Sequence, residues 1–341
     1  MTPPAVPLTQ RAIVQSRYGP VRDVLALSET VPVRPPGPHE VQVEVRAAGV
    51  NPIDWQMIEG NRRLIARRRF PFTPLFDLAG VVTAVGDGVT SFRVGDRVHG
   101  DNEVDAGGTA EYVNVRSGLL AAVPAGLDFA AAAALPLAAQ TALTCLDSGQ
   151  VADGTHVAVI GASGGVGHLA VQTARAAGAH VVGVAGARNL DFVRSLGADE
   201  AVDRHTDDLP SRFGADSFDV VIDCVGGREQ WLRAQRVLRP GGRFVTIARD
   251  EDGVVTLASA ARLLSRITAR KIRGAGPRGT KYVPVFLKAS GSLQRRVNDL
   301  VGDGRVRAHV SRSFPLTPEG VHAALEESRA GRVTGKLVLQ R

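Results

Sequence analysis

Residues 156–189 constrain the fold of this chain more than any other stretch. The apolar run HVAVI (156–160) predicts a buried strand, and the glycine-rich turn GASGGVG (161–167) follows it directly. Apolar residues then recur at helical spacing through Ala177, Gly178 ends the predicted helix, and HVVGVA (180–185) predicts a second strand. A strand, a crossover helix and a second strand in this order predict a parallel sheet.

The glycines of the turn stand where a dinucleotide-binding loop needs them. Gly161 allows the tight exit from the strand, Gly164 lets a pyrophosphate approach the backbone, and Gly167 lets the helix pack closely on the sheet. The free N–H groups that open the helix then face the phosphates. The alternative is a tight turn without a ligand. The sequence predicts a dinucleotide site whose loop contacts are Ala162, Ser163, Gly164, Gly165 and Val166.

The end of the second strand discriminates between the two nicotinamide cofactors. An NAD site places Asp or Glu there to accept the ribose 2′-hydroxyl, whereas this strand ends in GARN (186–189), with no carboxylate before Asp191. A guanidinium pairs with a 2′-phosphate that a carboxylate would repel. We therefore predict NADP(H), held here by Gly186, Arg188 and Arg204, which follows the short strand EAVD. The alternative is that both arginines are solvated surface residues.

The rest of the chain divides into a β-rich part and an alternating part. Before residue 130, short segments split by Pro and Gly predict mostly antiparallel strands at 41–50, 79–86, 96–100 and 110–115. After residue 137, helical stretches alternate with apolar runs, as in a parallel sheet, at 156–160, 180–185, 218–225 and 243–248. The tail predicts a helix near 282–303, a strand at 305–310, a helix at 318–330 and a strand at 336–340.

Composition and charge argue against several classes of protein. With 341 residues, 44% of them apolar, the chain predicts two folded domains. The alanine-rich run 129–146 is interrupted by Pro136 and Gln140, so it predicts two packed helical segments and no membrane span. The net charge of +7 comes from scattered arginines without a nucleic-acid-binding motif, so we expect no nucleic-acid partner. The N-terminus lacks a signal-peptide pattern, and the two cysteines match no disulfide framework, which predicts a cytoplasmic protein.

The whole chain resembles the medium-chain dehydrogenase/reductase superfamily, and most of all its zinc-independent quinone oxidoreductase branch, the zeta-crystallin-like enzymes. The resemblance covers nearly all 341 residues and rests on the glycine turn together with AAGVNPIDWQMIEG (47–60), FDLAGVVTAVGDGVTSFRVGDRVHG (76–100), GGTAEYV (107–113), LPLAAQTALTCL (135–146), SLGADEAVD (195–203), LRPGGRF (238–244) and GRVTGKLVL (331–339). It implies an α/β fold with two domains and the active site in the cleft. A GroES-like β-rich catalytic domain (1–136, rejoined by 277–341) would accompany a Rossmann-type parallel-sheet dinucleotide-binding domain (137–276). It also implies a homodimer.

The positions that hold zinc in other members of the superfamily are changed here. Those members carry Cys where this chain has Asn51, and Gly-His-Glu where it has Leu75-Phe76-Asp77. Phenylalanine has no donor atom, and the short segment 100–109 has no cysteine for a structural zinc site. We therefore expect no metal.

Without zinc, hydrogen bonds or the cofactor must polarise the substrate carbonyl. The resemblance implies an NADPH-dependent reductase that transfers hydride to a quinone or to the activated C=C of an enone or enal. By position, it implies Asn51 and Asp54 as catalytic residues at the nicotinamide end, with Thr141, Ile247 and Lys336 among the cofactor contacts. The alternative for NPID (51–54) is a proline turn whose polar side chains only cap the following helix.

This chain also departs from its relatives near the expected chemistry. Residues 55–62 contain no tyrosine, so the sequence identifies no proton donor, and Leu75 and Ala248-Arg249 replace glycines that relatives commonly have. An arginine cluster follows the loop and is either a solvated run or a rim that attracts an anionic substrate; its members are Arg62, Arg63, Arg67, Arg68 and Arg69. The departures keep open a second function, that of an NADPH-binding non-enzymatic protein with a crystallin-like, sensor or structural role.

Overall fold

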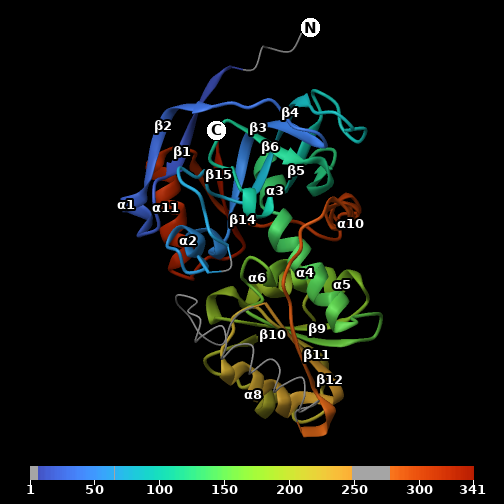
Figure 1. Ribbon diagram of the computed structural model, residues 1–341. Helices are drawn as coiled ribbons and strands as arrows, with labels where there is room; N and C mark the ends of the chain where they lie inside the picture. The colour runs from blue at the N-terminus through green and yellow to red at the C-terminus, as the bar shows by residue number, and fades with distance from the viewer. Residues whose placement is uncertain (1–6, 65, 248–276) are drawn as a thin grey trace. The chain divides into compact units, whose positions relative to one another are not determined.

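The computed structural model describes residues 7–64, 66–247 and 277–341, and the chain forms two compact units (Figure 1). The first unit contains Met1–Gln140, Lys288–Asp303 and Ala308–Arg341. The second unit contains Thr141–Leu287 and Gly304–Arg307. The chain passes from the first unit to the second within one helix, α4 (Pro136–Gly149).

A seven-stranded sheet forms the first unit. Its order is β14-β15-β3-β4-β5-β7, with β6 also paired to β3, and every neighbouring pair except β14 and β15 is antiparallel. The C-terminal strand β15 lies beside β3, so the tail of the chain completes this sheet (Figure 1). The strands are β3 (Glu40–Val50), β4 (Asp77–Val85), β5 (Arg97–Asp101), β6 (Tyr112–Arg116), β7 (Leu120–Ala122), β14 (Val310–Pro315) and β15 (Lys336–Gln340). A separate antiparallel ribbon joins β1 (Thr9–Gln15) to β2 (Leu25–Pro32).

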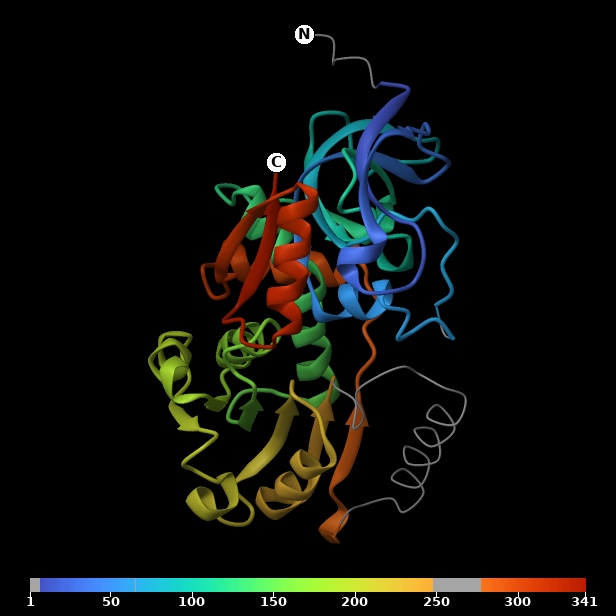
Figure 2. The same cartoon turned by 90° about the vertical axis from the view of Figure 1, so that its left-hand side faces the viewer.

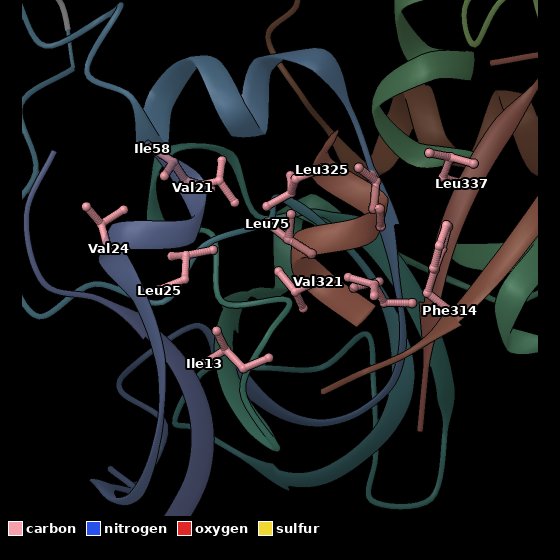
Figure 3. Close-up of a cluster of buried hydrophobic side chains, with 14 residues drawn as sticks. Ile13, Val21, Val24, Leu25, Ile58, Leu75, Phe314, Val321, Leu325 and Leu337 are labelled. Atoms are coloured by element: carbon pink, nitrogen blue, oxygen red, sulfur yellow. The ribbon is translucent and has the colours of Figure 1, made fainter. Parts of the chain in front are cut away.

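Helices of the first unit pack their apolar sides against these strands. Helix α11 begins where Thr317 accepts a hydrogen bond from the N–H of Gly320 and where proline occupies the first turn, a favourable helix start. Its buried Val321 and Leu325 join a cluster with residues from β1, α1, α2, β14 and β15 (Figure 3). The helices are α1 (Val21–Val24), α2 (Pro52–Ile58), α3 (Phe129–Ala133), α10 (Gly291–Gly302) and α11 (Pro318–Arg329), with short 3-10 turns at Glu103–Asp105 and Ser117–Leu119.

A six-stranded parallel sheet forms the second unit. Its order is β10-β9-β8-β11-β12-β13, so the chain first winds outward from β8 in one direction and then in the other. The runs predicted at 156–160 and 180–185 are strands with those bounds, and in Figure 2 the arrows of β12 and of the orange β13 run side by side. The strands are β8 (His156–Ile160), β9 (His180–Ala185), β10 (Glu200–Asp203), β11 (Phe218–Asp223), β12 (Leu238–Thr246) and β13 (Lys281–Pro284).

Crossover helices connect the parallel strands. Small residues let α5 lie close to the sheet: Ala170 and Ala174 are fully buried, and Gly167 opens the helix. The connecting helices are α5 (Gly167–Ala176), α6 (Leu190–Ser195), α7 (Leu209–Phe213) and α8 (Arg228–Val237), with 3-10 turns at Ala187–Asn189 and Pro277–Gly279. The expected α/β fold class, with one β-rich unit and one Rossmann-type parallel-sheet unit, is confirmed.

The tail differs from the sequence prediction in three places. The helix expected near 282–303 begins only at Gly291, after the Ser290 cap, because 281–284 pair with β12 as β13. Residues 277–287 therefore belong to the parallel-sheet unit, whereas we expected them in the β-rich domain. The strand expected at 305–310 is also wrong, since β14 starts at Val310. Gln172 accounts for this, because its side-chain amide accepts the N–H of Arg307 and donates to the carbonyl of the same residue, both at 3.0 Å.

The alanine-rich run 129–146 forms α3 and the first part of α4, as predicted. Within the described ranges, every helix is too short or too polar to cross a bilayer.

Candidate functional site

The glycine turn connects β8 to α5 at the point where the winding of the parallel sheet reverses. Gly161 has φ of +79°, which a residue with a side chain adopts only with strain. A Cβ on Gly167 would stand 2.1 Å from the carbonyl oxygen of Gly161, so only glycine fits there. Open parallel sheets bind ligands outside the carboxyl ends of the strands at such a reversal. The turn therefore has both the place and the backbone of a phosphate-binding loop.

Two other glycines leave room that the protein itself does not use. A Cβ on Gly164 would meet only the carbonyl oxygen of Gly161, at 3.4 Å, and one on Gly186 would meet only Nε of Arg204, at 4.0 Å. Internal packing therefore does not explain these glycines, whereas the close approach of a ligand to the backbone does. The space at both positions fits a dinucleotide that lies from the glycine turn to the end of β9.

The residues predicted to surround the adenosine end lie together at the carboxyl end of β9. The N–H of Arg204 donates to the carbonyl of Ala185 at 2.8 Å, which places this arginine beside Gly186. Its Nε lies 3.0 Å from Nε2 of His205, and the side chains of Arg188 and Arg204 are exposed. Asn189 donates to the Ser163 hydroxyl at 3.1 Å and so ties the glycine turn to this corner. The corner is cationic, and neither the turn nor residues 186–190 carry a carboxylate.

The remaining predicted contacts of the second unit, Ile247 and Thr141, lie outside the glycine turn and β9. Ile247 directly follows β12, where its N–H donates to the carbonyl of Asp223, and Thr141 is buried on α4. Asp223, which the sequence analysis did not single out, ends β11 and accepts hydrogen bonds from the N–H groups of Val225 and Gly226 and from the Thr246 hydroxyl. This buried carboxylate fixes the loop that follows β11. Ala248 and Arg249 lie outside the described residues.

The first unit brings polar groups from four neighbouring strands together. Lys336 begins β15, Asn51 directly follows β3, Asp77 begins β4 and Asp101 ends β5. Because these strands are adjacent and antiparallel, their ends meet. Gly49 and Asp101 both pair with Asp77. The four side chains are at most 4% exposed. Strand order alone thus assembles a buried polar cluster from distant parts of the chain.

Asn51 is at the centre of this cluster. Its Nδ2 donates to Oδ2 of Asp77 at 2.9 Å, and its Oδ1 accepts from Nζ of Lys336. Lys336 also donates to the carbonyl of Val50 at 3.0 Å and lies 3.6 Å from Oδ2 of Asp77. The other Asp77 oxygen accepts the N–H of Leu137 at 2.9 Å. Asn51 thus takes part in the capping box of α2, and its side chain in addition has partners on β4 and β15.

Asp54 has the capping role that the proline-turn alternative proposed. It lies in the first turn of α2, and its Oδ2 accepts the N–H of Asn51 at 2.7 Å. Its Oδ1 is buried, and no donor among the described residues forms a hydrogen bond of normal distance and angle with this oxygen. Cap and chemistry are not mutually exclusive, because the second oxygen is not needed for the cap.

Burial dominates the electrostatics of the cluster. It raises the pKa of Asp54 well above its usual range, and the nearby Asp77 adds to this effect. Burial also raises the pKa of Asp77, while Lys336 opposes the shift, and the pKa of Asp101 rises to about 7. The pKa of Lys336 is lowered by burial against the pull of Asp77. One ammonium group faces several buried carboxyls, and burial opposes the charged form of each group while the attraction between opposite charges favours it.

The arginines of the cluster differ in their exposure to solvent. Arg63, Arg67 and Arg69 are exposed, whereas Arg68 is only 9% exposed and its guanidinium lies over the Phe72 ring, 4.2 Å from the centroid. Burial lowers the pKa of Arg68, and Asp105 and Asp54 are among the groups that oppose the shift. A sequence pattern of five arginines gives no sign that one of them is buried.

The described part of the chain offers no set of side-chain donors for a metal ion. Over residues 7–64, 66–247 and 277–341, the structure contains no group of three or more His, Cys, Asp or Glu side chains arranged to hold an ion. Among the positions changed from the zinc members, Asn51 accepts a hydrogen bond from an ammonium group through its amide oxygen, and Phe76 has no donor atom, so neither offers a metal ligand.

Two family models match the chain. Residues 37–125 match the alcohol dehydrogenase GroES-like domain, and residues 196–339 match a model described as zinc-binding dehydrogenase.

Curated relatives and solved structures extend over nearly the whole chain. A chloroplast envelope quinone oxidoreductase homolog from Arabidopsis thaliana is 34% identical over 91% of this chain and 92% of its own length. A chloroplastic NADPH-dependent alkenal/one oxidoreductase from the same plant is 31% identical over 98% of this chain and 80% of its own. The structure of the quinone oxidoreductase from Coxiella burnetii superposes with a TM-score of 0.81 at 28% identity, covering 97% of this chain and 99% of that one.

Proposed function

The chain belongs to the medium-chain dehydrogenase/reductase superfamily, in its quinone oxidoreductase branch, and from this premise we propose that it is an NADPH-dependent, zinc-independent reductase of quinones or of activated C=C bonds. It is an oxidoreductase, and its family uses a nicotinamide cofactor. The proposal concerns the form of that cofactor, the independence from zinc and the acceptor.

The cationic corner at the end of β9 carries the proposal for NADPH. Gly186 leaves space there, Arg204 borders the space, and Arg188 follows closely in the chain. A 2′-phosphate gains charge-assisted hydrogen bonds from guanidinium groups, while an NAD site needs a carboxylate directly after β9, where residues 186–190 have none. The name of the alkenal/one oxidoreductase from Arabidopsis thaliana states NADPH dependence and agrees with this assignment.

The zinc-independent reaction is supported by the cluster around Asn51. Lys336 lies beside Asn51 and Asp77, and its ammonium charge would repel a divalent cation at that position. Bound NADPH supplies the hydride. The protein then has to orient the acceptor and stabilise the negative charge that develops on its carbonyl oxygen, for which Asn51 offers an amide donor and Asp54 a carboxyl group. The backbone N–H groups of the glycine turn and of the first turn of α5 would bind the phosphates of the cofactor.

The acceptor class follows from the same chemistry. Quinones, enones and enals share a carbonyl oxygen that becomes an enolate or phenolate when hydride adds. The names of the relatives include both quinone and alkenal/one reduction. The exposed residues Arg63, Arg67 and Arg69 would further attract an acceptor that carries a carboxylate or an acidic phenol.

The decisive experiment is a turnover assay with purified protein. We expect loss of NADPH absorbance with a panel of quinones, enones and enals, a lower kcat/KM with NADH, and no change after treatment with a zinc chelator. Tight NADPH binding without turnover of any acceptor would contradict the enzymatic function and favour a non-enzymatic NADPH-binding protein. Equal use of NADH would overturn the cofactor assignment. We also propose a cytoplasmic homodimer, which light scattering and a fluorescent fusion would test.

A further inference from the structure

The direction in which the Asn51 amide points is set by its neighbours. An ammonium group can only donate hydrogen bonds and a carboxylate can only accept them. Lys336 therefore requires the oxygen of the Asn51 amide, and Asp77 requires its nitrogen. The reverse orientation would set –NH₂ against the ammonium and oxygen against the carboxylate.

The orientation of the Asp77 carboxylate is fixed, because each of its oxygens already has a hydrogen-bond donor. Its Oδ1 accepts the N–H of Leu137 at 2.9 Å, and its Oδ2 accepts from Asn51 while it faces Lys336. The side chain is completely buried at the start of β4, so water cannot replace either partner at low cost. Both oxygens of Asp77 therefore accept hydrogen bonds, and a change at this residue affects the partners of each.

One donor of Asn51 remains uncommitted within the described residues. The amide nitrogen carries two hydrogens, and one of them goes to Asp77. The Asn51 oxygen is taken by Lys336, so the second N–H is the group this side chain can offer to a ligand. That N–H is complementary to an oxygen that gains negative charge, as the acceptor's carbonyl oxygen does when hydride adds to the carbon skeleton conjugated to it.

We propose that Asp77 is a positioning residue of the reductase: it fixes the Asn51 amide so that its second N–H is presented to a carbonyl oxygen at the reacting centre. The inference rests on the proposed function, because that function supplies the carbonyl. Two carbonyls qualify, that of the acceptor and that of the nicotinamide carboxamide, and both would accept the same hydrogen bond.

Asp77→Asn breaks the arrangement without changing its size. The new –NH₂ group must point either at the N–H of Leu137 or at the donors of Asn51 and Lys336, so one contact becomes donor against donor. We expect a lower Tm and a lower kcat. The exposed Asp128, which caps α3 through the N–H of Ala131, is a matched control, and Asp128→Asn should change neither.

The exchange of the two side chains separates folding from positioning. In the double variant Asn51→Asp/Asp77→Asn, the new carboxylate accepts from Lys336 and from the new amide, and the new amide oxygen accepts the N–H of Leu137. The hydrogen bonds that join positions 51, 77 and 137 are satisfied again, and Lys336 meets its carboxylate at position 51 in place of Oδ2 of Asp77, but the side chain at position 51 has lost its N–H. We expect the Tm to recover to near the wild-type value while kcat stays about 10- to 100-fold lower.

The readouts identify the carbonyl and decide the proposal. An unchanged Kd for NADPH with a reduced kcat assigns the hydrogen bond to the acceptor, and a weakened Kd assigns it to the nicotinamide carboxamide. Recovery of both Tm and kcat in the double variant would make Asp77 a purely structural residue, and failure of Tm to recover would contradict the complementarity itself. If the wild-type protein turned over no acceptor, the proposed function would fail, whereas the Tm series would still test the cluster.

Discussion

Oδ2 of Asp77, the first residue of β4, lies 3.6 Å from Nζ of Lys336, the first residue of the C-terminal strand β15. The strand β3 runs between them and contributes the carbonyl of Val50 to the same cluster, and the next residue, Asn51, contributes its side chain. A buried ion pair is sensitive to the loss of either partner, because the remaining charge stays in a poorly solvated place.

Lys336→Met should therefore destabilise the protein by about 3–5 kcal/mol at pH 8. The loss should be smaller at pH 5, where the buried carboxyls can take up protons and no longer need a counter-charge. Thermal denaturation at the two pH values measures the effect, and Lys288→Met, at an exposed lysine, is the control. Equal losses at both pH values would mean that Lys336 does not compensate the carboxyls.

Asp101→Asn should stabilise the protein in a manner that grows with pH. The pKa of this buried carboxyl is raised from 3.8 to about 7, so the folded state binds its proton more tightly than the unfolded state. The wild-type contribution is complete below pH 4 and is lost as the pH rises through 7. The variant keeps an oxygen for the N–H of Glu103 and should gain roughly 2–4 kcal/mol over wild type between pH 4 and pH 8. Urea denaturation across this range would contradict the prediction if the difference stayed constant.

Alanine at two glycines of the turn should give opposite phenotypes. Gly167→Ala places a Cβ 2.1 Å from a backbone oxygen, so the turn must distort and Tm should fall. Gly164→Ala meets only one atom, at 3.4 Å, so Tm should hold while the Kd for NADPH weakens at least about tenfold through lost backbone approach. Calorimetry measures the binding, and Gly302→Ala, which meets nothing within 4 Å, is the control. NADPH binding to Gly164→Ala with wild-type affinity would remove the turn from the cofactor site.

Arg204→Gln and Arg188→Gln should each weaken NADPH binding by about 10- to 100-fold, the value of a charge-assisted hydrogen bond. NADH affinity should not change, since NADH has no 2′-phosphate. Arg194→Gln, which removes an exposed pair with Asp191 on α6, provides the matched control. A loss for one arginine alone would show which of the two binds the phosphate, and a parallel loss of NADH affinity would point to damage to the fold.

Reversal of the exposed arginines, as Arg67→Glu/Arg69→Glu, tests the attraction of anionic acceptors. We expect kcat/KM for a carboxylated quinone to fall at low salt and the deficit to shrink at high salt, because exposed charges are screened. A neutral quinone of similar size serves as the internal comparison. A salt-independent kcat/KM that matches wild type would exclude these residues from substrate attraction.

Local sequence signals were sufficient for much of the fold. The strands β8, β9 and β15 have the predicted bounds, because a continuous apolar run or a returning terminal strand leaves little ambiguity in type. The segment 305–310 misled the prediction, since its alternating pattern suits a strand but the backbone of Arg307 is taken by the Gln172 amide. That contact is between residues far apart in the chain, and no local pattern encodes it.

The candidate site was likewise predictable only in the part that local sequence encodes. The glycine turn and the absence of a carboxylate after β9 are local features, so the sequence predicted them. The partners of Asn51 come from β4 and β15, and only the strand order brings them together. Asp77 begins a mostly apolar strand, and a lone carboxylate in such a place was the sequence signal of a buried role.

The bond between Gln172 and Arg307 limits how the nucleotide-binding unit can be isolated. A recombinant fragment that stops at residue 287 would leave the buried Gln172 amide without both of its hydrogen bonds to the Arg307 backbone, and of its backbone partners the carbonyl of His168 would remain. Grafting this unit onto another scaffold therefore requires a discontinuous design, in which the peptide 304–307 is supplied together with 141–287.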